Sequence, residues 1–470
     1  MQKKNRMQIL AAAVAMVCAS LGHAEDLIQI YQQARQADPT LAIADANKGA
    51  VGENVAQARS FLLPQIGASV SYNRNDTSIN GVSPQQVLIG DTTNYVLVPN
   101  NSVNKDRSRP AQIELSQSIF NWTNWERLRV SRSQAASASA DYDSASQALF
   151  VRTANAYFAV LTAQDQLVFA QANEKALARQ LDQAEQRFQV GLSAITDVHE
   201  ARANHDSAVA QVIQAQNNVD NAREAVIQII GKDFGELKKL RDQLPLEKPS
   251  PADLQSWVDL AVKQSPTIAS AQFSLEAAEH NVGLQRSGHY PTLSASVTRS
   301  DTPAWGTSRQ FIGLPDVGSV GPFHSNSVTG DTLIGVTLNI PIFTGGLVSS
   351  QVRQAVYQRD EAQDQLELQK RQVVANTRNA YRAVIAGISE VEATRQAVIS
   401  AQSSLEATQA GFEVGTRTIV DVLLSQQTLF QAQSNYSQAR HQFVLSGLQL
   451  KQSAGTIEGK DLEAVNALLE

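Results

Sequence analysis

The stretch Phe188-Gln189-Val190-Gly191 interrupts a long segment without glycine or proline, and it recurs as Phe412-Glu413-Val414-Gly415, 224 positions later. Two further pairs of stretches keep nearly the same spacing. Asp38-Pro39-Thr40-Leu41 returns as Ser265-Pro266-Thr267-Ile268, 227 positions later, and Leu63-Pro64-Gln65-Ile66 returns in the same register as Tyr290-Pro291-Thr292-Leu293. A register kept over more than a hundred residues predicts an internally duplicated chain.

Very long helices are predicted on both sides of each glycine. Four segments are almost free of glycine and proline: 121–190, 192–230, 347–410 and 416–446. Seventy helical residues would extend about 100 Å at 1.5 Å per residue, so these helices must pack on one another. Because glycine just past a helix end is a common stop signal, Gly191 and Gly415 are predicted as the turns of two helical hairpins.

Short alternating segments predict four β-strands. Apolar and polar residues alternate with period two in residues 66–73, 111–116, 293–298 and 334–340. The polar positions are mostly Ser, Thr, Gly, Asn and Gln, which suit a face in contact with water, and about ten residues suffice for a tilted crossing of a bilayer. The stretches 76–108 and 301–330 are rich in turn-forming residues and are predicted as long loops. A soluble β-sandwich would show the same alternation.

The N-terminus is typical of a secretory signal peptide, predicted over residues 1–24. It has three basic residues, then an apolar run, then a small-residue cleavage site: Lys3, Lys4, Arg6, residues 9–17 and residues 22–24. Met16 and Val17 precede Cys18 where a lipidation site would need small residues. Removing residues 1–24 takes away the single cysteine, so the mature chain has no disulfide, and the net charge falls from −6 to −9 because three basic residues leave. That charge disfavours nucleic acid as a partner.

The duplication predicts four parts in the mature chain: a first structural repeat at 25–231, an inter-repeat linker at 232–258, a second repeat at 259–455 and a C-terminal tail at 456–470. Four strands cannot close a barrel, which takes about eight, and open strand edges in lipid leave backbone groups unpaired. Two chains would give a barrel filled by side chains, whereas three would give twelve strands around a water-filled interior. We therefore predict an α+β membrane protein, in which a trimeric 12-stranded β-barrel is continued by a long α-helical barrel.

Two motifs around the predicted turns carry a family resemblance. They are Arg187-Phe188-Gln189-Val190-Gly191-Leu192 followed by Ala194-Ile195-Thr196-Asp197-Val198, and the continuous stretch from Gly411 to Val422, GFEVGTRTIVDV. Through these motifs the chain resembles the TolC family of outer-membrane efflux and secretion channels, and the resemblance covers the whole mature chain. It is stronger to the non-lipidated branch of the family than to the lipidated branch. The resemblance implies a homotrimer in the lipid of the outer membrane that extends into the periplasm. It also implies docking to an inner-membrane pump of the RND, ABC or MFS type through a periplasmic adaptor (membrane fusion) protein.

Charged residues near the two turns differ between the repeats. Both repeats carry an aspartate six positions after the glycine, Asp197 and Asp421, but Arg417 is matched by Ser193. An arginine in one hairpin could reach a carboxylate in a neighbouring hairpin. The residues alone favour ordinary solvated charges, since exposed ion pairs contribute only about 0–1 kcal/mol.

The resemblance implies a larger role for these residues, namely a network that holds the periplasmic entrance closed. By position, Arg417 would contact Gln180, Thr196 and Asp197. Phe412 stands where the family has a tyrosine that hydrogen-bonds the same aspartate, so that bond is missing here. The three copies of Asp421 would form a pore-lining carboxylate ring, while Leu424 replaces a second aspartate. The resemblance thus implies weaker cation selectivity and easier opening.

The sequence carries no motif for catalysis, for a metal or for another cofactor. The seven histidines are scattered, and no nucleophile motif or phosphate-binding glycine loop occurs. The leading interpretation is a passive exit duct for multidrug efflux or type I protein secretion, energised by its inner-membrane partner. One alternative is a periplasmic coiled-coil adaptor or scaffold, and another is a secreted adhesin with a trimeric stalk. Neither explains strands that recur within each repeat.

Overall fold

The computed structural model describes residues 24–89, 91–312 and 319–470, so the predicted signal peptide lies, except for residue 24, outside the described residues. The chain folds into two compact units. One unit consists of Gly52–Ser133 and Glu276–Asp360 and contains the β-sheet. The other consists of the described residues up to Val51 together with Gln134–Leu275 and Glu361–Glu470, and it is helical.

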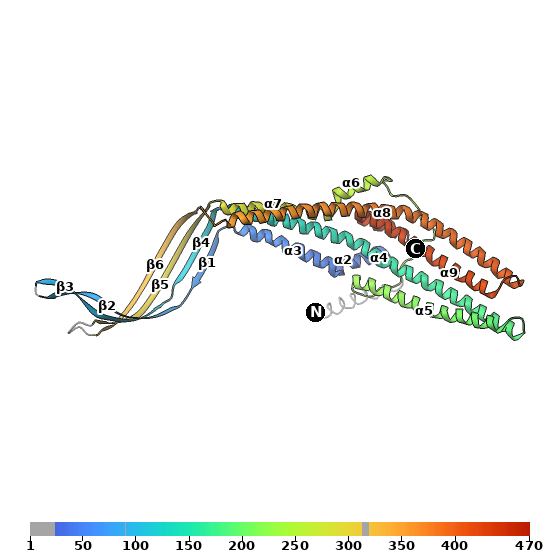
Figure 1. Cartoon of the computed structure of the whole chain (residues 1–470), viewed down its shortest axis with the longest axis horizontal. Helices are drawn as coiled ribbons and strands as arrows, with labels where there is room; N and C mark the ends of the chain where they lie inside the picture. The colour runs from blue at the N-terminus through green and yellow to red at the C-terminus, as the bar shows by residue number, and fades with distance from the viewer. Residues whose placement is uncertain (1–23, 90, 313–318) are drawn as a thin grey trace, which may run out of the picture. The chain divides into compact units, whose positions relative to one another are not determined.

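The structure confirms the prediction that the segments almost free of glycine and proline form very long helices. The helices of the first half are α2 (Leu27–Ala37), α3 (Pro39–Ser60), α4 (Trp122–Gln189) and α5 (Ile195–Ile230). Those of the second half are α6 (Leu254–Gln264), α7 (Pro266–Arg286), α8 (Leu347–Glu413) and α9 (Ile419–Ser453), followed by α10 (Gly459–Asn466). Among the described residues, two helices precede the strands in each half, and a long helical hairpin, α4–α5 or α8–α9, follows them (Figure 1). No helix within the described residues is at once long and apolar enough to cross a membrane.

Six β-segments form one antiparallel sheet. They are β1 (Gln65–Val70), β2 (Asn73–Ile89), β3 (Thr92–Ser108), β4 (Ala111–Phe120), β5 (Thr292–Ile312) and β6 (Ser319–Asn339). Because β1 pairs with β4 while β2 pairs with β3, and both β3 and β4 pair with β5, the segments amount to four long strands. The strand made of β1 and β2 lies at one edge of this sheet and β6 lies at the other.

The register of the sheet aligns the predicted apolar positions. Ile66 pairs with Leu115, Leu115 with Val297, and Val297 with Ile334, so one apolar row crosses all four strands. The row is exposed, from 37% for Leu115 to 75% for Ile66 and Ile334. The next row holds small and polar residues, because Ser116 pairs with Ser296 and Ser296 with Gly335. The sheet therefore has one apolar and one polar face in this region.

The predicted loops at 76–108 and 301–330 are wrong. Within them β2 pairs with β3 as far as Ile89 and Thr92, and β5 pairs with β6 over most of its length. Apolar and polar residues do not alternate regularly in these segments, so they lack the period-two signal, yet a backbone ladder needs no such alternation. Polar pairs across the strands add to it, since the Ser308 hydroxyl donates to Asn104 Oδ1 at 2.7 Å. The strands are thus about two to three times as long as expected.

The end of the chain belongs to the core of the helical unit. Leu462 and Val465 of α10 and the following Leu469 are buried in one cluster with Leu27 and Ile30 of α2. Leu469 also forms a β-bridge with Leu240 of the linker. The predicted tail at 456–470, whose role the sequence left open, thus packs against both the linker and α2.

Candidate functional site

The two hairpin turns have the same backbone. Gly191 has φ 77° and Gly415 has φ 79°, a left-handed conformation that residues with a Cβ rarely adopt. The Gly191 N–H donates to the Phe188 carbonyl at 3.0 Å, and the Gly415 N–H donates to the Phe412 carbonyl at 3.1 Å. Both predicted turns therefore end their helices in the way that glycine allows.

A small apolar cluster joins the two hairpins near these turns. Leu177 of α4 and Ala208 of α5 are buried against Ile419 and Leu423 of α9, and Phe412 of α8 packs on the same cluster. The predicted gate residue Phe412 thus has a structural role although it lacks a hydroxyl. The four helices of the two hairpins meet in this one cluster.

Arg187 is a tip residue that the sequence reasoning missed. Its guanidinium lies 4.6 Å from the centre of the Phe412 ring, a cation–π contact between the first hairpin and the second. The two residues are far apart in sequence, so no local pattern signals the contact. The family resemblance implied that Phe412 lacks the hydrogen bond of a tyrosine. In the structure Phe412 contacts Arg187 instead.

The two tip aspartates are held differently. Asp421 and Thr418 form a capping box at the start of α9, in which the Asp421 carboxylate accepts from the Thr418 N–H and from its hydroxyl, both at 2.9 Å. Both bonds lower the pKa of Asp421 below its ordinary value, and the bond from the backbone N–H has the larger effect. The first hairpin has Ala194 at the cap position, which has no side-chain cap bond. Asp197 therefore lacks the hydroxyl partner that holds Asp421.

Arg417 is exposed, and its stem lies against Gly411 at the end of α8. A Cβ on Gly411 would come within 2.7 Å of Arg417 Cγ, so the glycine makes room for the arginine. The Arg417 N–H also donates to the Gly411 carbonyl at 3.2 Å. At the matching positions the first hairpin has the opposite order, Arg187 and then Ser193. The cation thus lies before the turn in one hairpin and after it in the other.

Gln180 and Thr196 complete the predicted gate residues. Gln180 is half-buried and its side-chain Oε1 has no hydrogen-bond partner, while Thr196 is exposed at the start of α5. Within the described part of the chain, no hydrogen bond or ion pair joins Arg417 to Gln180, Thr196 or Asp197. The network that the resemblance implies is therefore not formed inside a single chain, and it stays a prediction.

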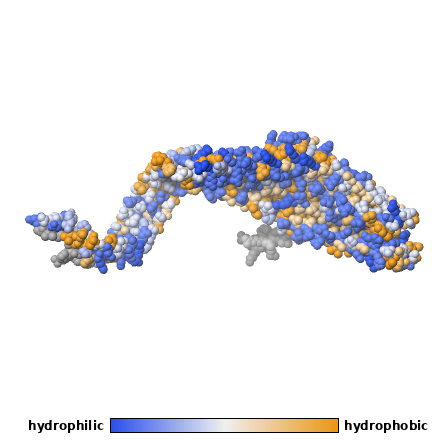
Figure 2. All heavy atoms as spheres, viewed as in Figure 1, coloured by the Kyte–Doolittle hydropathy of each residue, from blue (hydrophilic) through white to orange (hydrophobic). Residues whose placement is uncertain are grey.

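The tips also expose apolar side chains. Val190 and Leu192 flank the first turn and are 70% and 77% exposed, and Val414 beside the second turn is 76% exposed. Leu424, at the position of the missing second aspartate, is 62% exposed. Hydrophobic residues accordingly show at the ends of the hairpins (Figure 2). Such exposed apolar groups are typical of a surface that meets another protein.

Comparison with known proteins agrees with this architecture. The model of the outer membrane efflux protein family matches residues 30–232 and again residues 257–456. The outer membrane protein TolC of Escherichia coli (strain K12) is 37% identical over 469 residues, which cover 99% of this chain and 89% of the relative. The alkaline protease secretion protein AprF of Pseudomonas aeruginosa is 26% identical, over 99% of this chain and 92% of the relative.

A solved structure supports the fold independently. The crystal structure of the Campylobacter jejuni CmeC outer membrane channel superposes with a TM-score of 0.70 at 19% identity, covering 95% of this chain and 90% of that one. At that identity the likeness concerns the fold alone. The family model and the full-length relatives carry the assignment: the chain belongs to the outer membrane efflux protein family, whose members are exit ducts in the outer membrane.

Proposed function

We propose that three copies of this chain close one 12-stranded β-barrel in the outer membrane. The single observation that carries this proposal is the exposed apolar row across a sheet with two free edges. Such a row suits lipid, but unpaired edge groups in lipid would cost several kcal/mol each. Pairing the β1–β2 edge of one copy with β6 of the next removes every edge when the ring closes. Three copies give twelve strands and leave a water-filled interior.

The helical hairpins would continue this barrel as a tunnel into the periplasm. Each chain supplies two hairpins, and the repeats at 25–231 and 259–455, with the linker at 232–258 and the tail at 456–470, place six similar units around one pore. Support comes from the repeated order of helices and strands and from the double match of the family model. The tips at Gly191 and Gly415 would then surround the periplasmic entrance.

The entrance would be closed by the tip residues of neighbouring hairpins. Arg417 is exposed, and Asp197 is not engaged by a cap hydroxyl, so both are available when chains assemble. Gln180 adds an unpartnered carbonyl oxygen, and Thr196 adds a hydroxyl beside Asp197. Asp421 is held at its own cap and would contribute a ring of three carboxylates to the constriction.

The cargo would be small toxic compounds, secreted proteins or both. One relative, which matches 99% of this chain, is named an alkaline protease secretion protein. Another relative is named a cobalt-zinc-cadmium resistance protein. The energy would come from an inner-membrane pump of the RND, ABC or MFS type, reached through a periplasmic adaptor that docks at the exposed apolar tips. The alternative of a periplasmic adaptor leaves the exposed apolar row of the sheet without a role.

Single-channel conductance in planar lipid bilayers tests the gate. Arg417→Ser removes the cation and should raise the conductance several-fold, because the entrance loses its contacts to Asp197. The matched control is Ser193→Ala at the corresponding position of the first hairpin, which should conduct like the unmodified protein. An Arg417→Ser channel with unmodified conductance would contradict the gate, and a protein that forms no channel at all would contradict the duct.

A further inference from the structure

The basic residues of the sheet all lie on one face. Ladder partners in an antiparallel sheet have their side chains on the same side, so the register places each residue relative to the apolar row that contains Leu115 and Val297. Among the strand residues that the structure describes, every lysine and arginine shares the face of that row: Arg74, Lys105, Arg107, Arg299 and Arg309. The charged residues on the opposite face of the described strands are all acidic: Asp106, Glu114 and Asp331. Charges that served solubility alone would put both signs on both faces.

The row of Arg74 and Arg107 lies beyond the apolar part of this face. Leu293, near the start of β5 and close in sequence to α7, pairs with Leu338 in an apolar row. Trp305 follows twelve residues later on the same face and pairs with Arg107, which in turn pairs with Arg74. Twelve strand residues extend about 40 Å, or about 30 Å along the axis of a barrel whose strands tilt by about 40°. Because the hydrocarbon core is about 30 Å thick, this row would lie at the headgroups of the leaflet farther from the helices.

Aromatic side chains lie at the same level. The ring of Tyr72, between β1 and β2, lies 6.3 Å from that of Trp305, and the two residues are 59% and 37% exposed. Tyrosine and tryptophan are enriched where lipid meets water, because each has an apolar ring and a polar group. Lys105 pairs with Thr307, one row further from the helices. The cations therefore lie just outside the level at which the hydrocarbon would end.

Lys105 and Arg107 are free to bind an anion. Arg74 pairs with Asp76 at 2.6 Å, so that carboxylate is already engaged. Within the described part of the chain, the side chains of Lys105 and Arg107 form neither a hydrogen bond nor an ion pair. The two neighbouring rows thus hold three cations on β2 and β3 but only one carboxylate.

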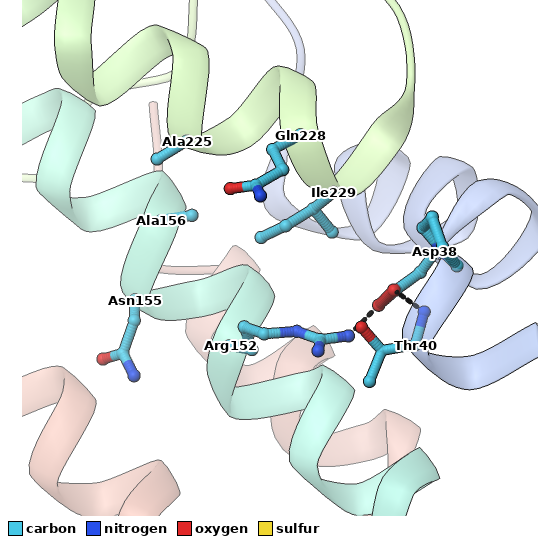
Figure 3. A pocket seen from close by; sticks show the side chains of 9 residues that line it. Asp38, Thr40, Arg152, Asn155, Ala156, Ala225, Gln228 and Ile229 are labelled. Atoms are coloured by element: carbon cyan, nitrogen blue, oxygen red, sulfur yellow. Dashed lines mark hydrogen bonds and ion pairs between the residues drawn. The ribbon is translucent and has the colours of Figure 1, made fainter. Parts of the chain in front are cut away.

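An arginine of the helical unit shows the contrast. Arg152 of α4 faces the carboxylate of Asp38, which also accepts the Thr40 N–H at 2.7 Å (Figure 3). The Asp38 side chain is 3% exposed, so the counter-charge of Arg152 comes from inside the chain. Lys105 is exposed and Arg107 is half-buried, and both are open to a counter-charge from outside the chain.

We propose that Arg74, Lys105 and Arg107 bind the phosphate groups of a lipid headgroup in the leaflet farther from the helices. Arg107 donates to the phosphate oxygens through its guanidinium, Lys105 acts as a point charge, and Tyr72 and Trp305 border the acyl chains. The occupant is a lipid rather than a free anion, because the cations continue an apolar face that is about one bilayer core tall. The inference rests on the proposed insertion of the sheet into the outer membrane and assigns a lipid site to its outer surface.

Lipid binding to the purified full chain in a neutral detergent tests the site. The protein is titrated with diphosphoryl lipid A, a glycolipid with two phosphates, and with the same lipid after removal of its phosphates, and native mass spectrometry counts the lipid adducts. The unmodified protein should bind the diphosphoryl form about ten-fold more tightly or better, and added salt should weaken the binding. Millimolar inorganic phosphate should not displace the lipid.

Charge variants identify the residues. Lys105→Gln/Arg107→Gln should weaken binding of the diphosphoryl lipid about 25-fold, and Lys105→Gln alone about five-fold, the effects of two cations and of one at an anionic lipid surface. Lys105→Arg/Arg107→Lys keeps both charges and should retain the binding. The matched control Lys263→Gln/Arg395→Gln removes one exposed lysine of α6 and one exposed arginine of α8, and its affinity should be unchanged.

Insertion is measured separately, so that a failed lipid site can be told from a failed duct. Reconstitution into vesicles of phosphatidylcholine, whose headgroup has no net charge, should be equal for the unmodified protein and Lys105→Gln/Arg107→Gln. Inserted protein whose lipid affinity does not fall in Lys105→Gln or in the double variant, or whose lipid is displaced by inorganic phosphate, overturns the site and leaves the duct in place. An equal loss in Lys263→Gln/Arg395→Gln would also overturn it. Unmodified protein that does not insert contradicts the duct and the site together.

Discussion

The two hairpins of this chain end in the same glycine turn but hold their aspartates differently. The second hairpin closes a capping box between Thr418 and Asp421, whereas the first has Ala194 in place of the threonine. One aspartate is thus occupied by its own helix and the other is free to bind elsewhere. In the proposed duct the repeated helices form the wall, and the departures from the repeat, above all Arg417 opposite Ser193, supply the residues that we propose for the gate.

Acidification should distinguish the two halves most strongly. His441 of α9 is buried and hydrogen-bonded through Nδ1 to Thr162 at 2.8 Å, whereas its counterpart in α5, Asn217, is exposed. Burial lowers the pKa of His441 from 6.5 to about 4, a shift that Asp165 opposes and Arg440 assists. The unfolded chain binds this proton near pH 6.5, but the folded chain binds it only near pH 4. Stability is therefore complete above pH 6.5 and is lost as the pH falls toward 4, by about 3 kcal/mol.

The measurement is the free energy of unfolding at pH 7 and at pH 4, in denaturant and detergent. His441→Asn, which copies the first half, should reduce the difference between the two pH values by about 3 kcal/mol. An equal pH dependence in the variant and in the unmodified protein would exclude His441 as its source.

The two turns should respond alike to loss of their glycines. Gly191→Ala and Gly415→Ala both force a Cβ into a left-handed backbone, which costs about 1–2 kcal/mol each. Thermal unfolding should show similar decreases for the two variants. Gly447→Ala, inside α9 with no atom within 4 Å of the new Cβ and no positive φ, is the control and should be neutral or stabilising. A large difference between the two turn variants would show that the turns are not equivalent.

The cap of the second hairpin should be separable from its turn. Thr418→Val keeps the shape of the side chain but removes the hydroxyl, so α9 should lose about 1 kcal/mol. The pKa of Asp421 should rise toward its ordinary value, which a carboxyl NMR titration measures. Thr428→Val, whose hydroxyl bonds only the Leu424 carbonyl of its own helix, is the control. An unchanged Asp421 titration in Thr418→Val would contradict the assigned cap.

Local patterns predicted the parts of the fold that depend on local physics. Gly191 and Gly415 mark turns because the backbone there needs a positive φ, and the glycine-free segments became α4, α5, α8 and α9. The extension of the strands through the stretch 76–108 was not predicted, because apolar and polar residues do not alternate regularly there. Its pairing depends on backbone bonds to strands elsewhere in the sequence.

The candidate site was predicted only in part, for a similar reason. The cap of α9 was not predicted, although the order Thr418-Ile-Val-Asp421 is a capping signal that is absent at Ala194. The contact between Arg187 and Phe412 joins different hairpins, so no local spacing indicates it. The contacts of Arg417 with Gln180, Thr196 and Asp197 are expected between assembled hairpins, and a single chain does not contain them.

We propose that Asp197 helps to close the entrance because its own helix does not hold it. Ala194→Thr would copy the cap of the second hairpin, stabilise α5 by about 0.5–1 kcal/mol and engage Asp197 locally. Ala194→Val adds the same bulk without the hydroxyl. In planar bilayers the Ala194→Thr channel should conduct better than the unmodified protein, while Ala194→Val should not. Equal conductance of the Thr and Val variants would show that Asp197 does not help to close the entrance.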